Sequence, residues 1–151
     1  LLWQLAYAEF YFTDTLWPQE KQIQNKSIVY HGEIRDKLKL TKLIKTCDVL
    51  ICPSWSEGMP NVILEAMALG LTVIATDVGA VNVLVNNKTG YLINNSNEIE
   101  SAIKQICNSS NDEINAKKQN ALNFIGSNFV WENLIDRFIL LINTAINKYK
   151  W

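Results

Sequence analysis

Two glutamates, Glu57 and Glu65, lie eight residues apart in a segment, residues 53–70, that is otherwise mostly apolar. Glu57 precedes Gly58, and Glu65 falls within the apolar run that follows Pro60. We expect this run to be a helix that is apolar nearly all round, with Glu65 on a narrow polar stripe. A carboxylate withdrawn from water needs hydrogen bonds, and the paired hydroxyls of a sugar ring or a ribose would provide them. The pattern therefore predicts a ligand that carries such hydroxyls. The alternative is that Glu65 reaches solvent or pairs with a nearby Lys.

The start of the same helix predicts a second binding feature. Proline suits the first helical position, which places Pro60 there and Asn61 one turn before Glu65. Amide groups at a helix N-terminus attract anions such as phosphate. Gly58 has no side chain, so the backbone before the helix can approach a ligand closely.

The elements that must position these residues follow from hydrophobic periodicity. Apolar runs alternate with helical patterns, which predicts an α/β fold with a parallel sheet covered by helices. We expect strands at 27–32, 48–54, 71–76 and 90–94, and helices at 35–47, 60–69, 79–87, 96–108, 111–126 and 130–150. Residues 2–9 fit a strand or a helix equally.

Helix ends are predicted from capping residues. Ser96 and Asp112 are the expected N-caps of the helices at 96–108 and 111–126. Gly70 and Gly126 are the expected stops of two helices, because glycine commonly follows the last helical turn.

The strand order brings the candidate chemistry to one edge of the sheet. In open α/β sheets, ligands bind beyond the carboxyl ends of the strands. The loop after strand 48–54 carries Glu57 and Trp55, and the loop after strand 71–76 carries Gly79. For Trp55 we expect core packing or an edge contact, and the alternative is that it stacks on a ligand.

Composition restricts the class of protein. The chain has 151 residues, 48% of them hydrophobic and 19% charged, with a net charge of −1, which fits one globular domain. No basic stripe is present, so nucleic acid is not an expected partner. The three cysteines match no zinc or redox spacing, and a reducing cytoplasm is the simplest compartment.

The segment PSWSEGMPNVILEAMALGLTVIATDVGAVNVLVNNKTGYLI resembles the core signature of the retaining GT-B glycosyltransferases, specifically glycosyltransferase family 4. Glu57 and Glu65 match the Glu-x7-Glu motif of that family. The likeness covers Gly32 to Ile93 and continues weakly into FVWENLIDRF. It implies a Rossmann-like parallel sheet with helices on both faces, the C-terminal half of a GT-B fold. It also implies a retaining hexosyltransferase that transfers a sugar from a nucleotide diphosphate sugar to a hydroxyl acceptor.

The resemblance assigns roles to individual residues. Glu57 is the expected catalytic residue, holding hydroxyls of the transferred sugar without acting as a nucleophile, and Glu65 is expected to bind the ribose. Sugar and diphosphate contacts are implied for Gly58, Met59, Pro60 and Asn61, and contacts near the base for Gly32, Glu33 and Ile34. The family uses no metal-binding Asp-x-Asp motif, so neither a metal nor a cofactor is expected beside the donor substrate.

The resemblance also implies what accompanies this domain. The family's basic pair for the diphosphate, the first strand and the N-terminal acceptor domain would precede Leu1, so residues 1–151 are expected to be one domain that is inactive alone. The parent enzyme is expected in polysaccharide biosynthesis, in the cytoplasm or at the cytoplasmic face of a membrane. Its acceptor would be a glycan or a lipid-linked sugar. The sequence departs from the family pattern at Ala80, where a second glycine is usual, and at Val83, where a glutamate is frequent.

Two other functions remain open from the residues. One is a non-catalytic or truncated module that binds nucleotide sugars or serves in an interaction. The other is a different nucleotide-handling enzyme of the same architecture, such as a nucleotide-sugar epimerase. The chain has no Gly-x-Gly-x-x-Gly after a strand, which counts against a dinucleotide dehydrogenase.

The closing helix at 130–150 carries more apolar residues than a surface helix needs. We expect part of this apolar surface to stay uncovered, and the resemblance supplies an N-terminal domain as its partner. The alternative is that the neighbouring helices at 96–127 cover all of it.

Overall fold

The computed structural model describes residues 10–12 and 25–148, and the element predicted at 2–9 lies outside this range. The chain forms two compact units, Leu1–Thr46 and Cys47–Trp151, which are described one at a time. The assignment of residues 1–151 to one domain stays a prediction.

The described residues of the first unit form a short parallel sheet and one helix. Strands β1 (Phe10–Phe12) and β2 (Ile28–Tyr30) pair in parallel. Helix α1 (Lys37–Ile44) begins after Asp36, whose carboxylate accepts hydrogen bonds from two amides of the first turn. The strand predicted at 27–32 and the helix predicted at 35–47 are therefore confirmed, with shorter bounds.

The second unit contains a three-stranded parallel sheet in the order β3-β4-β5. Its elements, in chain order, are β3 (Val49–Cys52), α2 (Asn61–Ala68), β4 (Thr72–Thr76), α3 (Val81–Leu84), β5 (Tyr91–Ile93), the 3-10 helix η3 (Ser96–Glu98), α4 (Ile99–Asn108), α5 (Asn111–Asn128) and α6 (Trp131–Lys148). All of these elements were predicted from the sequence, η3 as the first turn of the helix at 96–108.

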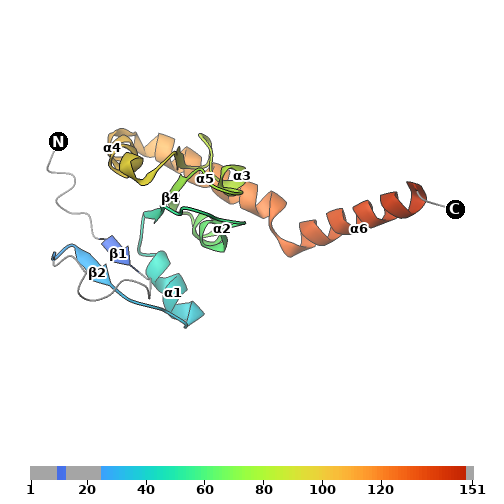
Figure 1. The fold of residues 1–151 in the computed structure, drawn as a ribbon, viewed down its shortest axis with the longest axis horizontal. Helices are drawn as coiled ribbons and strands as arrows, with labels where there is room; N and C mark the ends of the chain where they lie inside the picture. The colour runs from blue at the N-terminus through green and yellow to red at the C-terminus, as the bar shows by residue number, and fades with distance from the viewer. Residues whose placement is uncertain (1–9, 13–24, 149–151) are drawn as a thin grey trace. The chain divides into compact units, whose positions relative to one another are not determined.

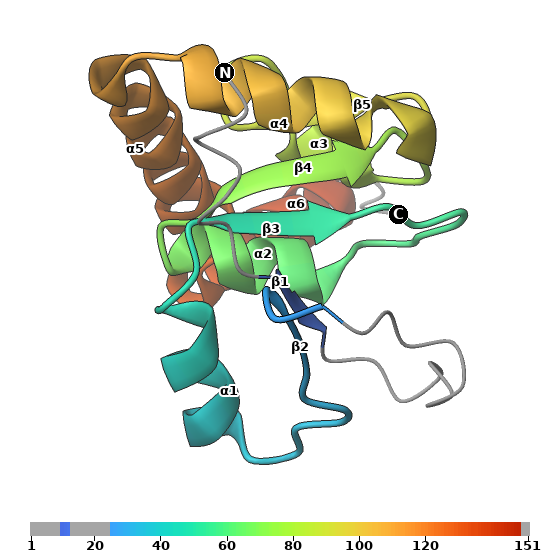
Figure 2. The same cartoon turned by 90° about the vertical axis from the view of Figure 1, so that its left-hand side faces the viewer.

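Helices cover both faces of this sheet, as Figure 2 shows for α4 and α2 on either side of β4. Ile74 of β4 packs with Ala102 of α4 in one apolar cluster. Val73 and Ala75 point to the opposite face, because side chains alternate along a strand, and that face carries α2 and α5. All five residues of β4 are buried. The predicted α/β fold with a parallel sheet between helices is confirmed.

The end of α2 has the geometry predicted at Gly70. Gly70 has a φ of 82°, which suits glycine. Its amide donates to the carbonyl of Met67 at 3.1 Å, and the amide of Leu71 donates to the carbonyl of Ala66 at 3.0 Å. This pair of hydrogen bonds is a Schellman motif, and it leads the chain directly into β4.

Three predicted helix ends were wrong. Asn95 caps the turn that begins at Ser96, through a hydrogen bond from the amide of Asn97. Ser110 caps α5 in place of Asp112, which lies in the first turn. Gly126 does not end α5, because no positive φ interrupts the helix there and the helix continues to Asn128.

The two long helices α5 and α6 close the chain (Figure 1). No described residue of α6 is buried. The prediction that its apolar surface stays uncovered is confirmed for the part of the chain that the structure describes. Among the described helices, none has the length and apolar character needed to cross a membrane.

Candidate functional site

Two loops meet beyond the carboxyl ends of β3 and β4, where the sequence predicts the site. The hydroxyl of Thr76 donates to the backbone carbonyl of Ser54 at 2.5 Å. The amide of Ala80 donates to the backbone carbonyl of Gly58 at 3.1 Å. The loop that carries Glu57 is thus tied at two places to the residues that follow β4.

Gly79 allows the closest approach of the two loops. It has a φ of 57°, and a Cβ atom added to it would lie 1.8 Å from the backbone oxygen of Glu57. No side chain fits at that distance, so position 79 requires glycine for both its conformation and its neighbour.

The carboxylate of Glu57 is half-buried and held in place. Its Oε1 accepts a hydrogen bond of 2.6 Å from the hydroxyl of Ser54. Its Oε2 has no partner among the described residues. Glu57 therefore presents one anchored and one available oxygen at the predicted edge of the sheet.

Glu65 does not have the buried environment that the sequence suggested. It is exposed, together with Asn61 and Ala68, because α2 buries only the face formed by Ile63, Ala66 and Met67. The prediction of a carboxylate withdrawn from water was wrong. Glu65 instead points its charge to solvent and has no partner in the described part of the chain.

The N-terminus of α2 is open to a ligand. The sequence predicts Pro60 at the first helical position, and this was wrong. Pro60 is the residue immediately before that position. No side chain caps the helix, and the amides of Asn61 and Val62 have no partner within the described ranges. Gly58, Met59 and Asn61 are exposed beside these amides, and Pro60 is buried.

Gly32, Glu33 and Ile34 belong to the first unit, directly after β2. Gly32 has a φ of 63°, and the Glu33 carboxylate forms an exposed ion pair of 3.0 Å with Arg35. The structure describes these three residues within that unit alone. A site that they share with Glu57 stays a prediction.

The electrostatics of the second unit's candidate site depend on carboxylates and backbone amides. Residues 46–87 contain no Lys or Arg, and their charged residues are Asp48, Glu57, Glu65 and Asp77. Within this segment, the N-terminus of α2 is therefore the feature that attracts an anion. Within residues 10–12 and 25–148, no three His, Cys, Asp or Glu side chains gather as a metal site would require.

The sequence places Thr76 at the end of the strand at 71–76, at this same edge of the sheet, but its hydrogen bond to the neighbouring loop was missed, because a strand pattern does not reveal such a bond. Trp55 is 93% exposed, so the prediction that it packs in the core or at the edge was wrong. A serine on each side of Trp55 in a turn-rich segment was the available signal for an exposed position.

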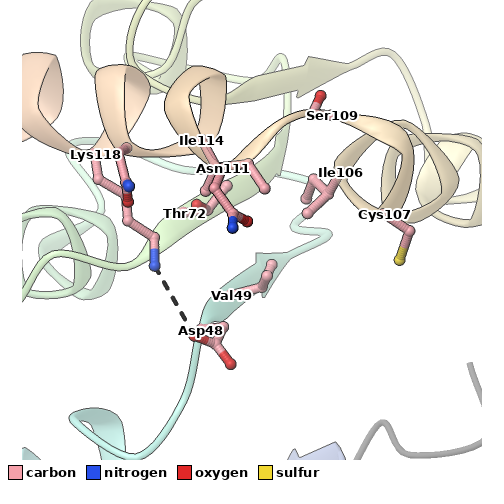
Figure 3. Close-up of a pocket in the computed structure, with 10 residues that line it drawn as sticks. Asp48, Val49, Thr72, Ile106, Cys107, Ser109, Asn111, Ile114 and Lys118 are labelled. Carbon is pink, nitrogen blue, oxygen red and sulfur yellow. Dashed lines mark ion pairs between the residues drawn. The ribbon is translucent and has the colours of Figure 1, made fainter. Parts of the chain in front are cut away.

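A hollow of about 420 Å³ lies at the opposite edge of the sheet (Figure 3). Val49 and Thr72, the first residues of β3 and β4, line it beside the N-terminal turns of α5. An ion pair of 3.9 Å joins Lys118 to Asp48 at its rim. Because parallel α/β sheets bind ligands at the carboxyl ends of their strands, we place the candidate site at Glu57 and not in this hollow.

Comparison with solved structures identifies the class of fold. The C-terminal domain of the group 1 glycosyl transferase LpcC from Francisella tularensis superposes with a TM-score of 0.62 at 27% identity, over 71% of this chain and 56% of that chain. Anabaena HepE in complex with UDP-glucose superposes with a TM-score of 0.66 at 21% identity, over 80% of this chain and 33% of that chain. The fold is the Rossmann-like α/β fold of the GT-B glycosyltransferases.

Sequence comparison identifies the family. Residues 13–109 match the family described as glycosyl transferases group 1. The chain belongs to this family. It is 34% identical over 112 residues to the Escherichia coli UDP-Gal:alpha-D-GlcNAc-diphosphoundecaprenol alpha-1,3-galactosyltransferase, over 72% of this chain and 29% of that protein. It is 29% identical over 119 residues to the capsular polysaccharide biosynthesis glycosyltransferase CapM of Staphylococcus aureus, over 74% of this chain and 30% of that protein. The chain thus spans about three tenths of the length of these relatives.

Proposed function

We propose that this chain is the donor-binding part of a retaining glycosyltransferase that moves a sugar from a nucleotide diphosphate sugar to a hydroxyl acceptor. The observation that carries the proposal is the position of Glu57 beside the uncapped N-terminus of α2, at the carboxyl ends of β3 and β4. A carboxylate and free amides at one edge suit sugar hydroxyls and a phosphate. The similarity to HepE, which was solved with UDP-glucose, supports this class of donor.

Each part of the site has a role in this proposal. The available oxygen of Glu57 accepts a hydrogen bond from a hydroxyl of the transferred sugar. The amides of Asn61 and Val62 bind the diphosphate, with Gly58, Met59 and Pro60 shaping the approach. Glu65 binds the ribose hydroxyls, which its exposure permits. Gly32, Glu33 and Ile34 lie near the base.

The proposed reaction retains the configuration at the anomeric carbon. The acceptor hydroxyl attacks from the face that the leaving phosphate occupies, and the phosphate assists by taking the proton. The domain contributes by positioning the donor and stabilising the leaving diphosphate, with no covalent step at either glutamate. A glycan or a lipid-linked sugar is the proposed acceptor, which the diphosphoundecaprenol in the name of the E. coli relative supports. Neither a metal nor a cofactor has a part in the proposal.

Substitution of the two glutamates tests this proposal in the full-length protein. Glu57→Ala should reduce sugar transfer strongly and leave the affinity for free UDP or GDP nearly unchanged. Glu65→Ala should weaken nucleotide binding by about tenfold to a hundredfold, because a hydrogen bond to a charged group contributes roughly 1.5–3 kcal/mol. Calorimetry with UDP and GDP and a transfer assay measure the two effects.

Glu113→Ala is the matched control, because Glu113 is an exposed helical glutamate in the first turn of α5, beside the opposite edge of the sheet. It should change neither transfer nor nucleotide affinity. The proposal is wrong if both site variants bind nucleotide and react as the wild type does.

A further inference from the structure

Ser54 is the residue through which Glu57 is connected to the sheet. Its backbone carbonyl accepts the hydrogen bond from Thr76 at 2.5 Å, and Thr76 is itself only 5% exposed. Its hydroxyl donates to Oε1 of Glu57 at 2.6 Å. Ser54 therefore joins a buried strand end to the carboxylate of the candidate site.

The hydroxyl of Ser54 has a single proton, which it donates to the hydrogen bond with Glu57. The sulfur of Cys52 lies 3.4 Å from the Ser54 oxygen, so the thiol donates in this arrangement. The resulting chain of hydrogen bonds runs in one direction, from Cys52 through Ser54 to Glu57. A glutamate side chain has several freely rotating bonds, and this chain fixes one of its oxygens.

The backbone of the loop is held independently of this hydroxyl. Gly79 packs against the backbone oxygen of Glu57, and Ala80 donates to the carbonyl of Gly58. Loss of the Ser54 hydroxyl would therefore release the Glu57 side chain without releasing the loop. The effect of the Ser54 hydroxyl on the Glu57 side chain can therefore be measured without a change in the loop backbone.

We propose that Ser54 is a positioning residue, which orients the Glu57 carboxylate so that Oε2 faces the hydroxyl groups of the donor sugar. The proposal rests on the proposed function, in which Glu57 contacts that sugar. Ser54 touches neither sugar nor nucleotide in this role, and its whole effect passes through Glu57.

The test is a double-mutant cycle in the full-length protein with Ser54→Ala, Glu57→Ala and both together. The probes are UDP, UDP-glucose, UDP-galactose, GDP and GDP-mannose, and the readout is the affinity for each nucleotide sugar relative to its free nucleotide. Ser54→Ala should lower this ratio about tenfold for the sugar that binds best and leave the affinity for the free nucleotide unchanged. In the Glu57→Ala background, Ser54→Ala should have no further effect.

Two variants separate positioning from a general structural role. Ser54→Thr keeps the hydroxyl, so its ratio should lie within a few-fold of the wild-type ratio. This expectation can be tested even when Ser54→Ala folds poorly. Ser56→Ala removes an exposed serine of the same loop that makes no hydrogen bond within the described chain, and it should change nothing.

The outcomes distinguish the two proposals. An unchanged ratio in Glu57→Ala overturns the contact between Glu57 and the donor sugar, and with it the role of Ser54, whereas the proposed function is overturned when transfer and nucleotide binding are also unchanged in both glutamate variants. If Glu57→Ala does lower the ratio, three results would overturn the role of Ser54 alone. Ser54→Ala could leave the ratio unchanged, or lower the affinity for the free nucleotide as much as the affinity for the nucleotide sugar. It could also add its full effect to that of Glu57→Ala in the double variant.

Discussion

The backbone of Gly79 lies against the backbone oxygen of Glu57, so position 79 does not tolerate a side chain. Gly79→Ala would place a methyl carbon 1.8 Å from a backbone oxygen and force a side chain into a φ of 57°. The left-handed conformation alone costs about 1–2 kcal/mol. We expect at least that loss in the free energy of unfolding, measured by urea denaturation.

Gly58→Ala is the control for this substitution in the facing loop. Gly58 has no positive φ, and nothing lies within 4 Å of an added Cβ. The change should alter the free energy of unfolding by less than about 0.5 kcal/mol. Equal stability of the two variants would mean that the loops do not meet as described.

At the scale of one element, α5 contains a glycine that it does not need. Gly126 is exposed inside the helix, and an added Cβ would meet no atom within 4 Å. Gly126→Ala should stabilise the protein by roughly 0.5–1 kcal/mol, because glycine loses more backbone freedom than alanine in a helix. Thermal unfolding measures this gain, and a decrease in Tm would indicate that residue 126 is a helix end after all.

The elements were predictable because their signals extend over many residues. The apolar run of β4 and the helical periodicity of α4 each involve every residue of a face that packs in the core. Gly70 is the only residue near the end of α2 that the sequence suggests as a helix stop. The caps of α5 were less certain because Ser110 and Asp112 are two residues apart and both suit a cap. Capping depends on which side chain reaches the free amides, and a pattern does not contain that geometry.

The juxtaposition of the loops that carry Glu57 and Gly79 was predictable, and the environment of their side chains only in part. The rule that ligands bind at the carboxyl ends of strands placed Glu57 and Gly79 together, which the hydrogen bonds between their loops confirm. The exposure of Glu65 was missed because apolar residues such as Val62 also stay exposed on α2. The bond from Ser54 to Glu57 depends on side-chain rotamers, which no spacing encodes.

At the scale of the whole molecule, the isolated chain should bind nucleotide sugars weakly and transfer none. Its segment 46–87 offers the diphosphate amides but no Lys or Arg. We expect dissociation constants in the millimolar range or weaker, equivalent to about −4 kcal/mol. NMR titration with UDP- and GDP-sugars, together with a transfer assay, measures both properties. Micromolar affinity or sugar transfer by the 151-residue chain would contradict this expectation.

Helix α6 should make the isolated chain self-associate. At about 100° per residue, one continuous apolar surface fills slightly less than half of its circumference. The residues of this surface are Trp131, Leu134, Ile135, Phe138, Ile139, Leu141, Ile142, Ala145 and Ile146. Phe138→Glu should reduce association, measured by sedimentation, without lowering the Tm of dilute, monomeric protein, because no described residue of α6 is buried.

Leu140→Glu is the control for Phe138→Glu. The two side chains are equally exposed, at 66% and 65%, but Leu140 lies on the polar side of the helix. Its substitution should leave the sedimentation coefficient unchanged. A monomeric wild-type chain, or equal effects of the two substitutions, would remove the case for an interaction surface on α6.

The sheet of the second unit has a further consequence for how the protein can be produced. Within the described chain, β3 pairs on one side only, with β4, and its residues Val49–Cys52 are all apolar. An apolar strand with one unpaired edge can pair with a strand of another chain. Refolding yield of the isolated chain would therefore fall steeply with protein concentration, and the lost material would form β-rich precipitate that dilution does not redissolve.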